Sequence, residues 1–300
     1  QSISPNEASK VLERLLETQT IDRNGSGSWI ELIGKAGTSE DLGSLLKRVS
    51  EGGFDTPASL RVVEALSEAN RLRKVTPGKE AAAIAGLFDH TDSTIQASAL
   101  RLAGAWKMHV FEGQFQTKAA DPQAARSARD AAIDALGSLG SSSAYEKLRA
   151  LLSQPGAASI RPQVAQALAT LNLADSIGPI LSVISELGQE ADLRATWETI
   201  LRQKRSEGVV LKALRDVTLS EDAARMGMRI ARETGKNLSE LLLGLERSGN
   251  LAPSEGAVGR ELINQLARQT MEGGDPDRGE AVYRRLELGC VMCHAIGGVG

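Results

Sequence analysis

The sequence predicts an all-α protein, an α-solenoid of short stacked helices. Three observations support this: apolar residues recur at helical spacing, Gly, Pro, Ser and Asp interrupt them at short intervals, and related segments return at a nearly constant period. Alanine and leucine dominate the apolar residues and aromatic residues make up only 3%, so small side chains must fill the core. That composition favours closely packed helices, and no segment reads as a convincing strand.

The expected helices begin and end at recognisable residues along the chain. GSGSW (25–29) precedes a helix start, and in TPGKE (76–80) the ring of Pro77 suits the start of another helix. In SLGSSSAYEKL (138–148) one helix stops and the next is capped. AYEKLRALLSQ and DSIGPILSVIS then read as the second helices of two repeats.

An Ala-Leu pair marks the repeat. It stands at residues 65/66, 99/100, 135/136 and 167/168, so the separations are 34, 36 and 32 residues. An Arg or Gln recurs a few residues earlier, at Arg61, Gln96, Arg129 and Arg161. This period is typical of helix pairs that stack as a solenoid, in which alanines are the points of close contact. After about residue 190 the register loosens, although the helical pattern continues in 209–217 and 238–249.

The composition gives no sign of a nucleic-acid or membrane partner. The formal charge is −3, from 35 Lys and Arg against 38 Asp and Glu, and the two signs are interspersed. The longest uncharged apolar stretch, AAAIAGLF (81–88), is far shorter than the roughly 18 to 20 residues that cross a bilayer, so we expect no membrane span in this segment. The opening QSISPNEASK has no feature of a signal peptide, and no hydrolase or nucleotide-binding motif occurs.

The only two cysteines of the chain lie three residues apart, in CVMCH (290–294). Cys290-x-x-Cys293-His294 has the spacing of c-type haem attachment. On one helical turn both thiols face the same side and can reach the two vinyl groups on one edge of a porphyrin. His294 can then offer a ring nitrogen to the iron as an axial ligand.

The segment before this motif, DPDRGEAVYRRLELG (275–289), reads as a helix. Asp275 is the expected N-cap, Pro276 takes the first helical position, and Val282 and Leu286 form an apolar pair one turn apart. The Gly-rich IGGVG that follows suits a backbone that runs close to a flat ring.

Three other interpretations of the cysteine pair stay open. A zinc site usually needs four ligands, whereas His90 and His109 lie far upstream and the chain has no third cysteine. A thioredoxin-like redox pair belongs to a βαβ context, and none is visible. The third interpretation is a structural disulfide or coincidence.

The segment RGEAVYRRLELGCVMCHAIGG (278–298) resembles the start of a class I-like cytochrome c domain. RLRKVTPG (71–78) and ALRLAGAWK (99–107) look like repeat segments of one family, and the whole layout is similar to the large haem-binding CxxCH proteins of planctomycetes and their relatives. In that family a dehydrogenase-like β-propeller is followed by HEAT-type repeats and a C-terminal cytochrome c domain.

The resemblance implies a covalent haem c, with Cys290 and Cys293 as thioether anchors and His294 as the proximal iron ligand. It places a second axial ligand, a Met, beyond Gly300, so we expect the cytochrome domain to be truncated here. It also implies export, to the periplasm or another compartment where haem is attached, and a redox donor, acceptor or fused dehydrogenase domain as partner. Any substrate oxidation would lie outside this segment, which is not expected to be catalytic itself.

Several other residues look functional, but we expect structural roles for them. Asp22 opens a segment similar to a calcium loop, but Ile33 stands where a bidentate Glu is needed. His90 falls at a turn, and His109 is a weaker candidate for a distal haem ligand than for a surface or core residue. The remaining large or sulfur-containing residues are expected to pack between repeats: Trp29, Trp106, Trp197, Met226 and Met228.

The repeats resemble HEAT-type repeats, so we expect a HEAT-like α-solenoid over 1–272. The incomplete N-terminal part of a class I-like cytochrome c domain, with its first helix, is expected over 273–300. The expected function is electron transfer through the haem, with the repeats as a spacer or docking scaffold in a larger, membrane-associated dehydrogenase-like protein. The alternative is a helical-repeat scaffold for protein interaction, in which the cysteine pair has no redox role.

Overall fold

Helices form all the regular secondary structure in the computed structural model, which describes residues 21–154, 158–251 and 260–285 together with Leu288, Cys290 and Ala295. No strand occurs among these residues, so the predicted all-α class is confirmed for this part of the chain. The chain divides into two compact units, Gln1–Asn250 and Leu251–Gly300. Helix 260–273, which the prediction placed in the repeat region, belongs to the second unit.

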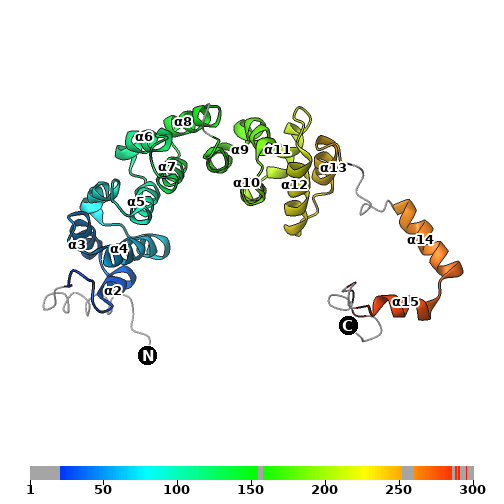
Figure 1. Ribbon diagram of the computed structural model, residues 1–300, viewed down its shortest axis with the longest axis horizontal. Helices are drawn as coiled ribbons and strands as arrows, with labels where there is room; N and C mark the ends of the chain where they lie inside the picture. The colour runs from blue at the N-terminus through cyan, green and yellow to red at the C-terminus, as the bar shows by residue number, and fades with distance from the viewer. Residues whose placement is uncertain are drawn as a thin grey trace. The chain divides into compact units, whose positions relative to one another are not determined.

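The first unit is a succession of helices with short connections (Figure 1). Its α-helices are α2 (Trp29–Ala36), α3 (Ser39–Ser50), α4 (Thr56–Glu68), α5 (Ser93–Ala105), α6 (Glu112–Ala120), α7 (Arg126–Leu139), α8 (Ser142–Leu152), α9 (Arg161–Glu186), α10 (Glu190–Arg202), α11 (Ser206–Ala213), α12 (Glu221–Glu233) and α13 (Ser239–Ser248). Helices of other types lie among them: the π-helix η1 (Ala69–Arg73) and the 3-10 helices η2 (Gly78–Leu87) and η3 (His109–Phe111).

The predicted boundary signals coincide with observed helix ends. The GSGSW segment leads directly into α2, which begins at Trp29. Gly140 ends α7 with a left-handed φ of 71°, and the Ser141 hydroxyl then accepts a hydrogen bond from the amide of Ala144 to cap α8. Pro77 does precede a helix, but that helix, η2, has 3-10 geometry.

Helices of the first unit pack against helices further along the chain as well as against the next one. One series of contacts joins α2, α4, α5, α7, α9, α10 and α12 in that order. In the other series α3 packs on η2, α6 on α8, α8 on α9, α9 on α11, and α11 on α13. Consecutive helices also touch, as α7 touches α8 and α12 touches α13. Each helix pair therefore covers the apolar faces of the pairs before and after it.

The Ala-Leu register lies on the first series, in α4, α5, α7 and α9. The leucine of each pair is at most 1% exposed: Leu66, Leu100, Leu136 and Leu168. Three of the alanines face a glycine of the preceding helix of the series, in the pairs Gly34–Ala65, Gly104–Ala135 and Gly137–Ala167. A Cβ on Gly104 would lie 2.5 Å from the Cα of Ala135. The predicted role of these alanines as close-contact points is therefore confirmed.

Helix α9 is two helices joined end to end, because Asn172 has non-helical backbone angles (φ −156°, ψ 84°). The two halves match the predicted Ala-Leu helix and its partner DSIGPILSVIS. By length and composition alone α9 is apolar enough to cross a membrane, and no other helix of the described residues is. The break at Asn172 and the burial of Leu168, Ile180 and Ile184 in the first unit fit a core element instead.

The second unit contains α14 (Arg260–Gly273) and α15 (Pro276–Tyr283). The described side chains of α14, which begin at Asn264, are all exposed, with Leu266 at 48% and Met271 at 89%. These two residues lie five positions apart, which is about 140° around the helix, so they lie on different faces. No side chain of α15 is buried.

Candidate functional site

The helix before the cysteine motif starts as predicted but is shorter. Asp275 caps α15, its carboxylate accepting a hydrogen bond from the amide of Arg278 at 3.0 Å, and Pro276 takes the first helical position. The helix ends at Tyr283 instead of continuing to 289. Val282 is 42% exposed, and its predicted partner Leu286 lies outside the described residues.

Cys290 is the one member of the predicted haem-binding set that the structure describes. Its side chain is partly exposed, and its thiol is free. The Sγ atom lies 3.7 Å from the carbonyl oxygen of Leu288, a weak local contact that leaves the sulfur accessible. Cys293, His294 and the Gly-rich end of the chain lie outside the described residues, so their geometry relative to Cys290 stays a prediction.

The described residues show no cluster of metal-binding side chains. No group of three or more His, Cys, Asp and Glu side chains is gathered within 21–154, 158–251 and 260–285. In the calcium-like segment the Asp22 carboxylate accepts a hydrogen bond from Ser26 Oγ, while Ile33 is 3% exposed in the core of α2. The expectation that this loop is structural agrees with both observations.

Both upstream histidines belong to local surface structure. His90 lies in a turn, where its Nδ1 atom accepts a hydrogen bond from the amide of Asp92. His109 is in η3 with a 55% exposed side chain, and its Nδ1 lies 3.8 Å from an oxygen of Glu112. His109 is therefore a surface residue, one of the two structural roles predicted for it.

The large side chains differ in how far they pack between helices. Trp197 in α10 is fully buried, lies against Gly227 of α12 and donates a hydrogen bond from Nε1 to the Ala223 carbonyl at 2.9 Å. Met226 and Met228 on either side of Gly227 are 6% and 5% exposed. Trp29 and Trp106 are only partly buried. The predicted packing role is confirmed fully for Trp197 and the two methionines.

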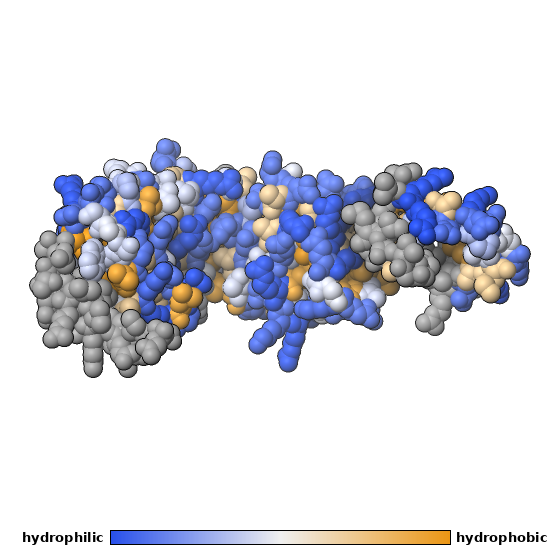
Figure 2. Space-filling model, turned by 90° about the horizontal axis from the view of Figure 1, so that it is seen from below, coloured by the Kyte–Doolittle hydropathy of each residue, from blue (hydrophilic) through white to orange (hydrophobic). Residues whose placement is uncertain are grey.

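Ion pairs join successive helices of the first series. Arg61 of α4 pairs with Glu31 of α2 at 2.6 Å, and this guanidinium holds the pKa of the Glu31 carboxyl below its usual value. Similar bridges run from α5 to α7 and between α10 and α12, in the pairs Arg101–Asp134, Arg194–Glu233 and Arg229–Glu190. The face shown in Figure 2 is accordingly mostly hydrophilic, with apolar residues scattered among polar ones.

The recurring Arg or Gln before each Ala-Leu pair has no common partner. Arg61 binds Glu31, the Gln96 amide donates to the Phe88 carbonyl, and Arg161 pairs with Glu186. The Nε atom of Arg129 is buried without a hydrogen bond. The recurrence visible in the sequence is therefore not a repeated interaction.

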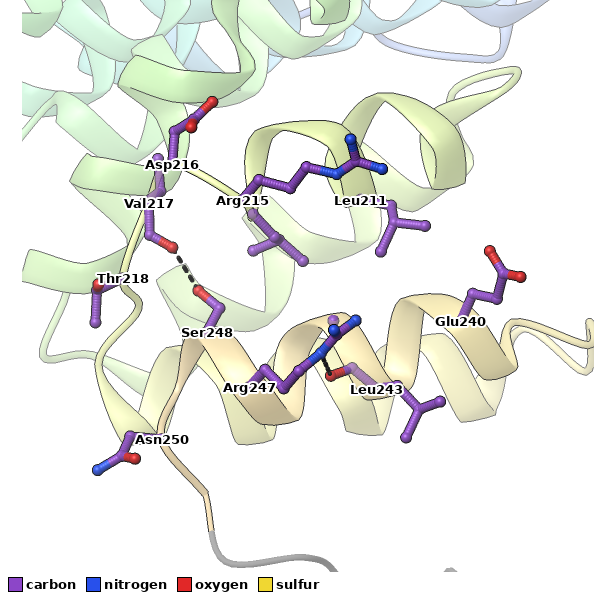
Figure 3. Close-up of a pocket in the computed structure, with 12 residues that line it drawn as sticks. Leu211, Arg215, Asp216, Val217, Thr218, Glu240, Leu243, Arg247, Ser248 and Asn250 are labelled. Carbon is purple, nitrogen blue, oxygen red and sulfur yellow. Dashed lines mark hydrogen bonds between the residues drawn. The ribbon is translucent and has the colours of Figure 1, made fainter.

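A groove between α11 and α13, of about 880 Å³, was not foreseen from the sequence (Figure 3). Its walls carry two arginines, Arg215 and Arg247, above apolar side chains of both helices. These arginines are 32 residues apart in the sequence: Arg215 lies in the turn after α11 and Arg247 on α13, and the two helices meet only in the tertiary structure. The sequence gives one indication of this groove, the three consecutive leucines 241–243. Three consecutive residues of a helix cannot all lie on one buried face, so at least one of them is expected to be exposed.

Comparisons with known proteins leave the fold and the motif as the only guides to function. No protein family, curated protein or solved structure matches this chain.

Proposed function

We propose that this chain carries a c-type haem on Cys290 and Cys293, with His294 as an axial ligand, and transfers electrons through it. The observation that carries the proposal is the Cys290-x-x-Cys293-His294 spacing, which holds both cysteines of the chain. The capped start of α15 at Asp275, fifteen residues earlier, and the free, partly exposed thiol of Cys290 are compatible with it.

In this proposal the two cysteines attach the haem covalently and the histidine binds its iron. Each thiol would add across one vinyl group, so that a carbon–sulfur bond forms, the thiol proton passes to the other vinyl carbon and nothing leaves. A neutral imidazole of His294 would bind the iron, and a hydrogen bond to its other ring nitrogen would tune that ligand. The bound haem would supply one-electron cycling between ferric and ferrous iron.

We infer that the first unit is a HEAT-like solenoid that positions this haem-binding segment. The Ala-Leu period of 32 to 36 residues and the contacts between second-neighbour helices support the inference. In this proposal the solenoid is a spacer or docking scaffold in an exported, dehydrogenase-like protein. Its partner is a fused dehydrogenase domain or a separate redox protein.

Covalent haem is the direct test. The full-length gene product, exported in a host that has the c-type maturation machinery, should keep a haem through denaturing electrophoresis and gain the mass of one haem. Cys290→Ala or Cys293→Ala should each leave one vinyl unsaturated and move the pyridine haemochrome band to longer wavelength, because the vinyl stays conjugated with the ring. The double variant should lose covalent haem completely.

A matched control separates haem loss from general damage. Met271→Ala removes a side chain that is 89% exposed in the same unit, and it should keep the wild-type haem content. A colourless wild-type protein, obtained under conditions where a known c-type cytochrome matures, would contradict the proposal.

The second candidate function is a helical-repeat scaffold for protein interaction, which the groove between α11 and α13 favours. The two functions differ in what the cysteines do. A scaffold would keep its partner in the Cys290→Ala, Cys293→Ala double variant, whereas a cytochrome would lose electron transfer.

A further inference from the structure

The groove between α11 and α13 has an apolar base that is held in place. Gly244 of α13 lies so close to Leu211 of α11 that a Cβ there would be 2.7 Å from the leucine Cδ1. At one end, Ser248 Oγ donates a hydrogen bond to the Val217 carbonyl at 2.6 Å, and the amide of Leu219 donates to the Ser248 carbonyl. These contacts fix the α11–α12 connection to the end of α13, so the groove is formed before any ligand arrives (Figure 3).

Two guanidinium groups in this groove have N–H donors without a hydrogen-bond partner among the described residues. Arg215 is exposed and forms no side-chain hydrogen bond or ion pair with any residue that the structure describes. Arg247 uses only Nε, which donates to the Leu243 carbonyl at 3.2 Å, and its terminal N–H groups stay free. Free guanidinium groups beside apolar surface bind carboxylates well, because they are weakly hydrated and can donate two parallel hydrogen bonds.

The two carboxylates of the groove do not neutralise these arginines. Asp216 points away from α13 in Figure 3, and Glu240 lies near the start of α13, two turns from Arg247. Neither forms an ion pair with Arg215 or Arg247 at 4 Å or less. A ligand in the groove would therefore meet two guanidinium groups that no carboxylate of the groove neutralises.

The position of the groove indicates that its occupant is a helix. Along the second contact series each helix lies against the one that follows, but no later helix of the first unit follows α13 within the described residues. Leu243 is consequently 52% exposed, whereas Leu241 and Leu245 of the same helix are fully buried and Leu242 is partly buried. A helix with an apolar stripe could continue the series and cover Leu243.

We propose that the groove between α11 and α13 binds an acidic amphipathic helix of a partner protein. Its apolar stripe would cover Leu211, Leu214 and Leu243, and its carboxylates would pair with Arg215 and Arg247. Charge complementarity selects this occupant over a neutral apolar helix, which would leave both guanidinium groups without partners. The proposal is independent of haem attachment, since every residue involved lies in the first unit.

The test uses a synthetic peptide and the full chain. The probe is a fluorescent, N-acetylated helical peptide of about 14 residues, with leucines on one face and glutamates beside them. A second peptide carries glutamine in place of each glutamate. Fluorescence anisotropy should show the glutamate peptide binding at least about tenfold more tightly, since each charge-assisted bond is worth roughly a factor of ten.

Three variants locate the binding. Arg215→Glu with Arg247→Glu should weaken the glutamate peptide by about tenfold or more, and Leu243→Ser should weaken both peptides. Arg232→Glu, on the exposed side of α12, makes the same charge change at an arginine outside the groove. It should change the affinity of the glutamate peptide less than about twofold.

Four results would overturn the proposal. The first is the absence of glutamate-peptide binding by the wild-type chain, and the second is an equal loss of affinity in the Arg232 variant and the double variant. The third is hydrogen-exchange protection of 240–248 that the peptide does not increase, because the groove would already be filled. The fourth is a dimer in sedimentation velocity that Leu243→Ser dissociates and the peptide does not, which would make a second copy the occupant.

Discussion

Asp130 in α7 shows how burial and ion pairing compete at a single side chain. Burial raises the pKa of its carboxyl, although the guanidinium of Arg126, 3.5 Å away, opposes the shift. Its Oδ1 atom is buried and has no hydrogen-bond partner among the described residues. Since the pKa is raised overall, the lost hydration of the charged carboxylate outweighs the attraction to arginine.

Asp130→Asn should therefore stabilise the protein at neutral pH, by about 0.5 kcal/mol. The raised pKa means that the folded chain binds this proton more tightly, so wild-type stability falls as the pH rises from the unfolded pKa through the folded one. The asparagine variant cannot lose a proton at this position, so its stability does not fall in that pH range. The difference in free energy of unfolding between variant and wild type, measured in urea, should therefore vanish at acidic pH. Glu64→Gln on the exposed side of α4 is the control. An equal gain in both variants would contradict the argument.

At the scale of elements, glycines determine how closely helices of the first series approach one another. Gly104 of α5 faces the backbone of Ala135 in α7, whereas Gly208 of α11 has open space around the position of a Cβ. Both lie within helices, where alanine is intrinsically favoured over glycine by up to about 1 kcal/mol. Their different surroundings therefore separate packing from helix propensity.

Gly104→Ala should destabilise the protein by about 1 to 3 kcal/mol, because the new methyl group forces α5 away from α7. Gly208→Ala should leave stability unchanged or raise it by up to about 1 kcal/mol. Thermal and urea unfolding of the two variants would measure both effects. A stabilising Gly104→Ala would mean that the two helices are less closely packed than the 2.5 Å approach indicates.

At the scale of the whole molecule, the two units differ in how much of their helical surface is buried. Helix α7 buries seven of its residues, including Ala131, Ile133 and Leu136, whereas every described side chain of α14 is exposed. Short helices without tertiary packing are marginally stable in water. The free energy of local opening should therefore differ strongly between the units.

Hydrogen exchange followed by mass spectrometry should show this difference. Amides of α7 should exchange only through global or near-global unfolding, while those of α14 should exchange faster by about a hundredfold or more. Helix α6 is a useful internal reference, because it is short yet packs on α7 and α8. Protection in α14 as strong as that in α7 would show that α14 is covered by a partner or a second copy.

The sequence alone was sufficient to predict the helical class, the Ala-Leu contact points and the capped start of α15, because these depend on local periodicity and on residues a few positions apart. The proposed haem-binding residues Cys290, Cys293 and His294 also come from the sequence alone, because that motif is five consecutive residues, and their role stays a prediction. Only tertiary structure decided the break of α9 at Asn172, the 3-10 geometry of η2 and the early end of α15. It alone brought Arg215 and Arg247 to one groove, because helices distant along the chain meet only when their apolar faces are buried together.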